Sequence, residues 1–313
     1  MKKDLLNVED LTSTDLDNII ALSETIKKNR LDWHHLSLAG KSIGMIFSKS
    51  STRTRVSFEV GIQELGGHSL FLDSNDMQLG RGETIEDTAK VLSRYIHGAV
   101  IRTYSHSDVV EFAKNARFPV INALTDEFHP CQILTDLFTI NEFSGKMQGV
   151  KVAYLGDCAS NMANSLILAA KLAGLDLVLS SPEKYKPHDE LMRVGNAANS
   201  NISWTTDVYD AVKDAEYIYT DVWVSMGDED EKEERMELLQ PYQVNMDIVN
   251  AASEGVRVMH CLPAHRGEEI SAEVLNSNQS IVFDQAENRL HVQKAILTML
   301  LDENWDQILK DNC

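Results

Sequence analysis

The densest group of reactive side chains lies between residues 47 and 55, in Phe-Ser-Lys-Ser-Ser-Thr-Arg-Thr-Arg. An apolar stretch with strand character (42–47) precedes this loop, and a helical pattern (52–65) follows it. A helix start presents free backbone N–H groups and the positive end of the helix dipole, which favour a bound anion. Hydroxyl and guanidinium groups add donors that suit phosphate oxygens. The candidate phosphate ligands are Ser51, Thr52, Arg53, Thr54 and Arg55.

Two further places in the first half of the chain could also bind a ligand. Arg102 ends an apolar run, where a buried charge needs an ion-pair partner or a ligand. In His129-Pro-Cys-Gln132 a proline opens a helical pattern over 132–141, at a place where open α/β folds bind ligands. His129 and Gln132 could donate to a carbonyl oxygen. The alternatives are a capped basic helix start for 51–55, an internal ion pair for Arg102 and a buried, hydrogen-bonded His129.

In the second half, Asp221 ends an apolar strand pattern and is followed by Val-Trp-Val-Ser225-Met226-Gly. A carboxylate at the carboxyl end of a strand can hold an ammonium group, and the loop could close over it. A simple loop cap is the alternative role for Asp221. The acidic run 228–235 is typical of a solvated loop that leads into a helix.

A thiol and two imidazoles lie in His260-Cys-Leu-Pro-Ala-His-Arg266, directly after another strand pattern. Successive residues of a strand point to opposite faces, so His260 is poorly placed to activate Cys261 as a nucleophile. The run Lys151-Val-Ala-Tyr-Leu-Gly-Asp-Cys-Ala-Ser-Asn161 lacks the later glycines of a dinucleotide-binding loop, which disfavours that function. It still leaves Asn161 at a helix start.

Short strand patterns alternate with amphipathic stretches, which is typical of βα units and mostly parallel sheets. The expected strands are 42–47, 69–72, 99–102, 119–122, 151–155, 175–179, 217–220, 256–260 and 280–283. The expected helices, besides 132–141, are 52–65, 84–95, 108–116, 162–173, 188–196 and 288–301. The fold class is therefore α/β, and Gly-rich residues 145–149 mark a border between two domains.

Composition narrows the function classes. A chain of 313 residues favours two domains, and no apolar run is long enough to cross a bilayer. The net charge of −19 would repel nucleic acid, so an anionic substrate needs a local basic site. Four cysteines without a CxxC pair fit neither a zinc site nor a disulfide framework, and the N-terminus has no apolar signal segment. We expect a cytoplasmic protein.

Four motifs together resemble those of the ornithine carbamoyltransferases, a branch of the aspartate/ornithine carbamoyltransferase family. The first two, Ser51-Thr-Arg-Thr-Arg55 and His129-Pro-Cys-Gln132, occur across that family. The other two, Asp221 with Ser225-Met-Gly227 and His260-Cys-Leu-Pro263, point to the ornithine branch. The resemblance covers essentially the whole chain, in order and spacing.

The resemblance implies two domains, each with a mostly parallel sheet flanked by helices. A carbamoyl-phosphate domain (1–145) precedes an ornithine domain (146–286), and a last helix (287–313) crosses back to the first domain. It also implies a homotrimer, or an assembly of trimers, with sites between subunits. Gln78 matches a loop that reaches the neighbouring subunit's site.

By the same resemblance, the site residues fall into three groups. The carbamoyl phosphate ligands are Ser51, Thr52, Arg53, Thr54, Arg55, Gln78, Arg102, His129, Gln132, Cys261, Leu262 and Arg289. The ornithine ligands are Asn161, Asp221, Ser225 and Met226. The catalytic residues are Cys261, Asp221, Arg102 and His129.

The implied reaction is the attack of a neutral δ-amine of ornithine on carbamoyl phosphate, which gives citrulline and phosphate without a metal or organic cofactor. Two positions depart from the family pattern. Ser160-Asn161 replaces an Asn pair, and Cys131 stands where a threonine or another small residue is common. A different acceptor amine such as putrescine, aspartate as acceptor, and a non-catalytic anion-binding scaffold are the competing interpretations. The direction of the reaction in arginine metabolism stays open.

Overall fold

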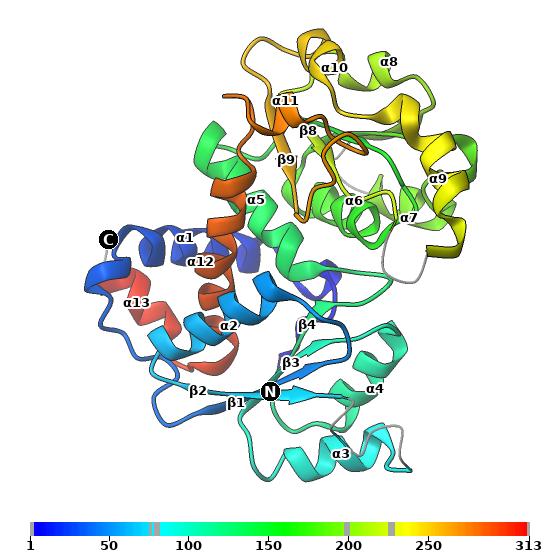
Figure 1. Cartoon of the computed structure of the whole chain (residues 1–313). Coiled ribbons are helices and arrows are strands. Elements are labelled where there is room, and N and C mark those ends of the chain that lie inside the picture. Colours follow the sequence, from blue (N-terminus) through cyan, green and yellow to red (C-terminus); the bar gives the residue numbers. More distant parts are fainter. Residues whose placement is uncertain (1–2, 75–76, 78–81, 197–200, 225–228, 312–313) are drawn as a thin grey trace. The chain divides into compact units, whose positions relative to one another are not determined.

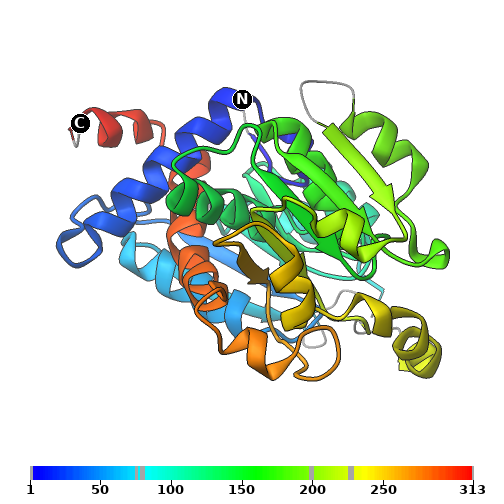
Figure 2. The ribbon, with the colours of Figure 1, turned by 90° about the horizontal axis from the view of Figure 1, so that it is seen from above.

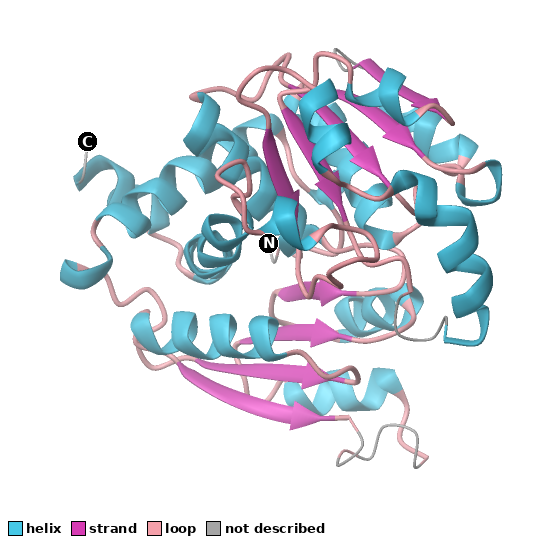
Figure 3. Ribbon diagram, turned by 45° about the horizontal axis from the view of Figure 1, so that its top comes forward, coloured by secondary structure: helices cyan, strands magenta, loops and turns pink. Residues whose placement is uncertain are grey.

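The protein is described here by a computed structural model that covers residues 3–74, 77, 82–196, 201–224 and 229–311. The chain forms two compact units, one of Met1–Phe138 with Asn288–Cys313 and one of Thr139–Glu287. Two helices, α5 (Pro130–Ser144) and α12 (Val282–Leu301), contribute residues to both units. Each unit contains a parallel sheet with helices packed against it, which confirms the expected α/β class (Figure 3).

The sheet of the first unit has the strand order β2-β1-β3-β4, and every neighbouring pair is parallel. The strands are β1 (Ser42–Phe47), β2 (His68–Asp73), β3 (Gly98–Arg102) and β4 (Val120–Leu124). The chain adds β2 on one side of β1 and then β3 on the other side. Open sheets bind ligands at the carboxyl ends of the strands beside such a reversal.

Helix α12 lies against helix α1 (Ser13–Lys28) in this unit (Figures 1 and 2), where Lys27 Nζ donates to Asn288 Oδ1 at 2.8 Å. On α4 (His106–Asn115), the apolar side chains Val109 and Phe112 pack with Val120 of β4 in a buried cluster. The remaining elements of the unit are α2 (Thr52–Glu64), α3 (Ile85–Leu92), α13 (Trp305–Asp311) and the 3-10 turns Val8–Asp10 and Arg30–Asp32.

The second unit has a five-stranded parallel sheet with the order β7-β6-β5-β8-β9. Its strands are β5 (Lys151–Leu155), β6 (Asp176–Ser180), β7 (Asn201–Thr205), β8 (Tyr217–Thr220) and β9 (Arg257–His260). The order reverses between β5 and β8. Open α/β sheets commonly bind ligands at such a reversal, which lies here where the loops after β5, β8 and β9 begin.

Polar N-caps start several helices of the second unit; Ser160 Oγ, for example, accepts from Ala163 N at the start of α6. The helices are α6 (Asn161–Ala173), α7 (Asp189–Gly195), α8 (Val208–Val212), α9 (Lys232–Leu239), α10 (Met246–Ala251) and α11 (Ala272–Leu275), with 3-10 turns at Glu183–Tyr185, Glu229–Glu231 and Gln240–Tyr242. Within the described ranges, no helix is both long and apolar enough to pass through a bilayer.

One expected strand is wrong. Residues 281–283 of the expected strand 280–283 are β-branched or aromatic. Ile281 N donates to Val258 O at 3.0 Å, but the pairing stops there, because α12 begins at Val282. The expected helix 132–141 is longer at both ends, since α5 runs from Pro130 to Ser144. Helix α1 and strand β7 were not predicted at all.

Candidate active site

The predicted anion-binding loop lies between β1 and α2 at the carboxyl edge of the first sheet. Ser51 is the N-cap of α2, and its hydroxyl oxygen accepts from Thr54 N at 3.2 Å. The cap fixes the first turn of the helix, whose N–H groups and dipole favour an anion. Both proposed roles of the hydroxyl are compatible, because its hydrogen can still be donated to a ligand.

Arg289, near the middle of α12, joins three helices beside this loop. Its Nη2 donates to Thr54 Oγ1 on α2 at 2.9 Å, and its Nη1 donates to Gln132 Oε1 on α5 at 2.9 Å. The Gln132 amide nitrogen in turn donates to Asp136 Oδ1 at 2.9 Å. The amide of Gln132 is therefore held in one orientation, and the expected ligands Thr54, Gln132 and Arg289 form one buried network.

Arg102 ends β3 and His129 directly precedes α5, and both side chains are buried. Burial, and then the positive charges of Arg289 and Arg102, hold the pKa of His129 well below its usual value. The imidazole is therefore neutral at neutral pH, with one N–H to donate and one nitrogen to accept. A neutral donor flanked by two guanidinium groups suits a carbonyl oxygen that becomes more negative during a reaction.

Arg55 does not join the other predicted ligands. Its Nε donates to Glu59 Oε1 at 3.0 Å, and its guanidinium carbon lies 3.7 Å from the centre of the Phe71 ring on β2. Thr52 is exposed and Arg53 is half-buried in the first turn of α2. The first unit thus brings together Ser51, Thr54 and Arg289. Arg55 instead contacts Glu59 and the Phe71 ring.

Lys49 is a supporting residue to which we assigned no role from the sequence, although it lies inside the 47–55 run. Its side chain is 5% exposed, its Nζ donates to Asp126 Oδ1, and it stands 4.1 Å from the centre of the Tyr104 ring. Asp126 belongs to the loop after β4. The pair of Lys49 and Asp126 therefore connects two of the loops that carry candidate ligands. The sequence signal for Lys49 was a lysine inside a loop rich in hydroxyl groups.

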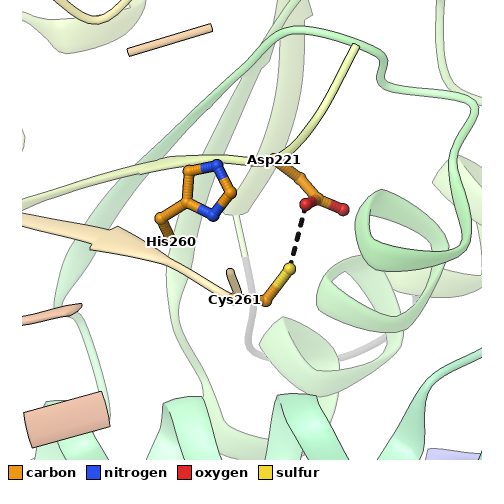
Figure 4. Close-up of side chains that lie close together, drawn as sticks. All are labelled: Asp221, His260 and Cys261. Atoms are coloured by element: carbon orange, nitrogen blue, oxygen red, sulfur yellow. Dashed lines mark hydrogen bonds between the residues drawn. The ribbon is translucent and has the colours of Figure 1, made fainter. Parts of the chain in front are cut away.

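In the second unit, Asp221 and Cys261 follow the neighbouring strands β8 and β9, and their side chains point toward each other (Figure 4). Cys261 Sγ donates to Asp221 Oδ1 at 2.9 Å, and the same oxygen accepts from Val222 N at 2.8 Å. Asp221 thus caps its own loop, as the alternative proposed, and also faces the thiol. A carboxylate and a half-exposed thiol together can bind an ammonium group and take part in its proton transfer.

His260 does not activate Cys261, as strand geometry predicted. Its Nδ1 accepts from Leu262 N at 2.8 Å and its Nε2 lies 3.0 Å from Glu269 Oε1. Leu262 has a φ of +58°, a left-handed conformation that residues other than glycine seldom adopt. The buried pair of His260 and Glu269 therefore holds the backbone just after Cys261. Glu269 carried no sequence signal, because nine residues separate it from His260.

A second set of contacts surrounds the turn after β5, where Asn161 begins α6. Gly156 has a φ of +129°, a backbone conformation that residues with a side chain rarely adopt, so this turn favours glycine. Arg235 Nη1 donates to Asp157 Oδ2 at 2.7 Å and to Trp223 O at 3.3 Å. Arg235 is buried, so the expectation that the acidic run 228–235 is solvated is wrong at this residue.

Three predicted site residues, Gln78, Ser225 and Met226, lie outside the described residues. The other two cysteines that the structure describes are buried, and burial raises the pKa of Cys131 to about 12. A cavity of about 290 Å³ lies at the opposite end of the second sheet, where β8 and β9 start with Tyr217 and Arg257. It is therefore separate from Asp221 and Cys261.

Two domain models of one protein family match the chain in succession. Residues 3–142 match the model of the aspartate/ornithine carbamoyltransferase carbamoyl-P binding domain. Residues 148–300 match the model of the Asp/Orn binding domain of the same family. Together the two models span nearly the whole sequence.

Individual relatives are similar over the same length. The ornithine carbamoyltransferase of Methanoculleus marisnigri is 50% identical over 302 residues, which cover 96% of this chain and 97% of the relative. That of Bacillus subtilis is 49% identical, with 96% and 94% covered. The solved structure of the Pyrococcus furiosus ornithine carbamoyltransferase has a TM-score of 0.92 at 47% identity, with 96% and 97% covered. The chain belongs to the aspartate/ornithine carbamoyltransferase family.

Proposed function

We propose that this protein is an ornithine carbamoyltransferase, which transfers the carbamoyl group of carbamoyl phosphate to the δ-amine of L-ornithine and gives L-citrulline and phosphate. The observation that carries the proposal is the 2.9 Å contact between Cys261 Sγ and Asp221 Oδ1. An acceptor amine has to be bound as an ammonium and must lose a proton before it attacks. The contact supplies an anionic partner and a thiol where two ornithine-branch motifs begin, and the relatives named above carry the same activity in their names.

The first unit would bind carbamoyl phosphate at its carboxyl sheet edge. The phosphate would contact the Ser51–Thr54 turn and Arg53, while Arg102 and neutral His129 donate to the carbonyl oxygen. Attack of the amine turns that oxygen into an oxyanion, and collapse of the tetrahedral intermediate expels phosphate. Preorganised donors to such an oxygen are worth about 3 to 4 kcal/mol each. Orientation of the two reactants can supply about 7 to 11 kcal/mol more.

In the second unit, Asp221 would hold the δ-ammonium group and receive its proton before the attack, while the Cys261 thiol stays hydrogen-bonded to the same carboxylate. The second proton, which the nitrogen loses when the intermediate collapses, would leave with the phosphate. Asn161, Ser225 and Met226 would bind the rest of ornithine, and Leu262 would contact the carbamoyl group. No metal or organic cofactor takes part in this scheme. We assign the activity to arginine metabolism in the cytoplasm, with either direction possible on the same residues.

The test offers carbamoyl phosphate with ornithine, putrescine or aspartate in parallel and compares kcat/KM for the three acceptors. We expect ornithine to be preferred clearly, because a diamine lacks the α-carboxylate and aspartate would meet the acidic Asp221. A higher kcat/KM for putrescine would show that putrescine, and not ornithine, is the preferred acceptor. Absence of turnover with all three acceptors would leave a non-catalytic anion-binding scaffold as the interpretation.

A Cys261→Ala variant measured in the same assay tests the thiol. We expect kcat to fall about 100-fold or more, within the range that general acid–base groups contribute, with a changed pH profile. Cys131→Ala is the matched control, since that thiol is buried beside Asn122 O in the first unit. An unchanged rate and pH profile in Cys261→Ala would refute the role of the thiol.

A further inference from the structure

A compact group of three potential metal ligands lies in the loop after β9, outside the residues assigned to the reaction. His265 Nδ1 is 3.6 Å from Glu268 Oε2 and 3.8 Å from Glu269 Oε2. Within the described part of the chain, these side chains form one of two groups whose ligand atoms all lie within 4.8 Å of one another. His265 and Glu268 are 47% and 30% exposed, so the group is open to solvent on one side.

Glu269 makes this group more than a surface cluster. Its side chain is completely buried, and its Oε1 accepts from the backbone N of His265 and contacts His260 Nε2. Its Oε2 is shielded from solvent and has no hydrogen-bond donor among the described residues, and it faces His265 Nδ1. A buried carboxylate oxygen without a donor is costly, and a bound cation would remove that cost.

His260 does not neutralise this carboxylate. Because His260 Nδ1 accepts from Leu262 N, the hydrogen of the imidazole is on Nε2, and the ring donates to Glu269 Oε1 in its neutral form. Two carboxylate oxygens and an imidazole nitrogen form a ligand set that zinc accepts. The separations of 3.6 and 3.8 Å need to close by only a few tenths of an ångström for bonds of about 2.0–2.2 Å in a tetrahedral site.

We propose that His265 Nδ1, Glu268 Oε2 and Glu269 Oε2 bind one divalent transition-metal ion of the zinc type, with water in the remaining position. The imidazole favours zinc and its neighbours in the first transition row over magnesium or calcium. Glu269 Oε1 keeps its contact with His260, so the metal adds to the support of the backbone after Cys261. This inference does not depend on which amine the enzyme accepts.

The second group in the same region, Asp221, His260 and Cys261, is a poorer metal site. Both nitrogens of His260 are engaged, one by Leu262 N and one by Glu269, and Cys261 Sγ donates to Asp221. A metal there would have to break these contacts. The experiment must nevertheless separate the two groups, because both lie next to the same loop.

The experiment is calorimetric titration of ZnCl₂ into the full-length, chelator-treated protein, with His265→Ala and Glu268→Gln as test variants. Both residues are partly exposed, so the variants should fold. His188→Ala is the matched control, since His188 also precedes two acids, Asp189 and Glu190, whose side chains are 91% and 83% exposed. We expect one zinc ion to bind per chain. The zinc affinity should fall tenfold or more in each test variant and stay unchanged in His188→Ala. Basal carbamoyl transfer should be unchanged in all three.

Cys261→Ala and cobalt distinguish the competing group. Zinc affinity retained in Cys261→Ala, and a Co²⁺ spectrum without thiolate charge-transfer absorption, support the proposed ligands. The proposal is overturned if zinc binding is lost only in Cys261→Ala, if both test variants bind like the unmodified protein, or if the unmodified protein does not bind zinc at micromolar concentration. None of these readouts requires turnover, so failure here is distinguishable from failure of the proposed activity.

Discussion

At the scale of single residues, the environment of His129 determines its protonation. Burial and the charges of Arg289 and Arg102 lower its pKa well below the usual value, so the folded protein keeps the ring neutral where an unfolded chain would protonate it. The unfolded state then binds more protons as the pH falls below about 6.5, and the stability of the fold decreases. The neutral ring suits hydrogen bonding to a carbonyl oxygen but makes the fold sensitive to acid.

His129→Gln should reduce this sensitivity, because a glutamine amide does not titrate. The substitution should restore at most about 1.4 kcal/mol of the free energy of unfolding for each pH unit below 6.5. We would measure the melting temperature of both proteins at pH 7.5 and 5.5, with the exposed His188→Gln as control. The variant should melt lower at pH 7.5 and recover part of the difference at pH 5.5. A difference that is constant with pH would contradict the assigned cause.

The residue types in the sequence indicate candidate reactive groups, but not all their contacts. The hydroxyls and arginines of 51–55 predict an anion site as a local pattern, whereas the contacts of Arg55 with Glu59 and Phe71 depend on helix periodicity and strand register. The partnership of Arg289 with Thr54 joins residues 235 positions apart. No local pattern contains that information.

At the scale of elements, the strands that are buried on both faces were predictable because they are continuous apolar runs. Strand β7 was missed since Asn-Ile-Ser-Trp-Thr is an edge strand with polar residues on one side. Helix α1 did carry a usable signal, a capping box of Thr12 and Asp15 followed by apolar residues at helical spacing. Residues 280–283 have strand composition but only one backbone bond to Val258 before the helix begins.

The three helices joined by Arg289 lead to a prediction at this scale. Arg289→Lys should raise the KM for carbamoyl phosphate about tenfold or more with a smaller change in kcat, because one ammonium cannot replace a fork that reaches both Thr54 and Gln132. Arg257→Lys, at the far end of the second sheet over Phe143, is the matched control. Equal KM values in the two variants would show that the Arg289 guanidinium group is not needed to position α2, α5 and α12 for carbamoyl phosphate.

At the scale of the whole molecule, the resemblance to the family predicts a trimer in which Gln78 of one subunit serves the site of the next. Light scattering should then give three times the 35.1 kDa chain mass, or a multiple of it. Mixing inactive Gln78→Ala and Cys261→Ala chains should restore activity, since some hybrid sites have both residues. A monomer in solution, or mixtures that stay inactive, would rule out shared sites.

The division of the first unit between the two ends of the sequence affects how the protein is made. Residues 139–287 form one continuous unit, which can fold as soon as they have left the ribosome. The other unit is complete only after residues 288–313 are made, because Arg289 contacts Thr54 and Gln132. The proposed anion-binding loop therefore gains its last partner at the end of synthesis, although it is among the first parts translated. A chain released before Arg289 would carry the thiol and the carboxylate but not a finished phosphate site.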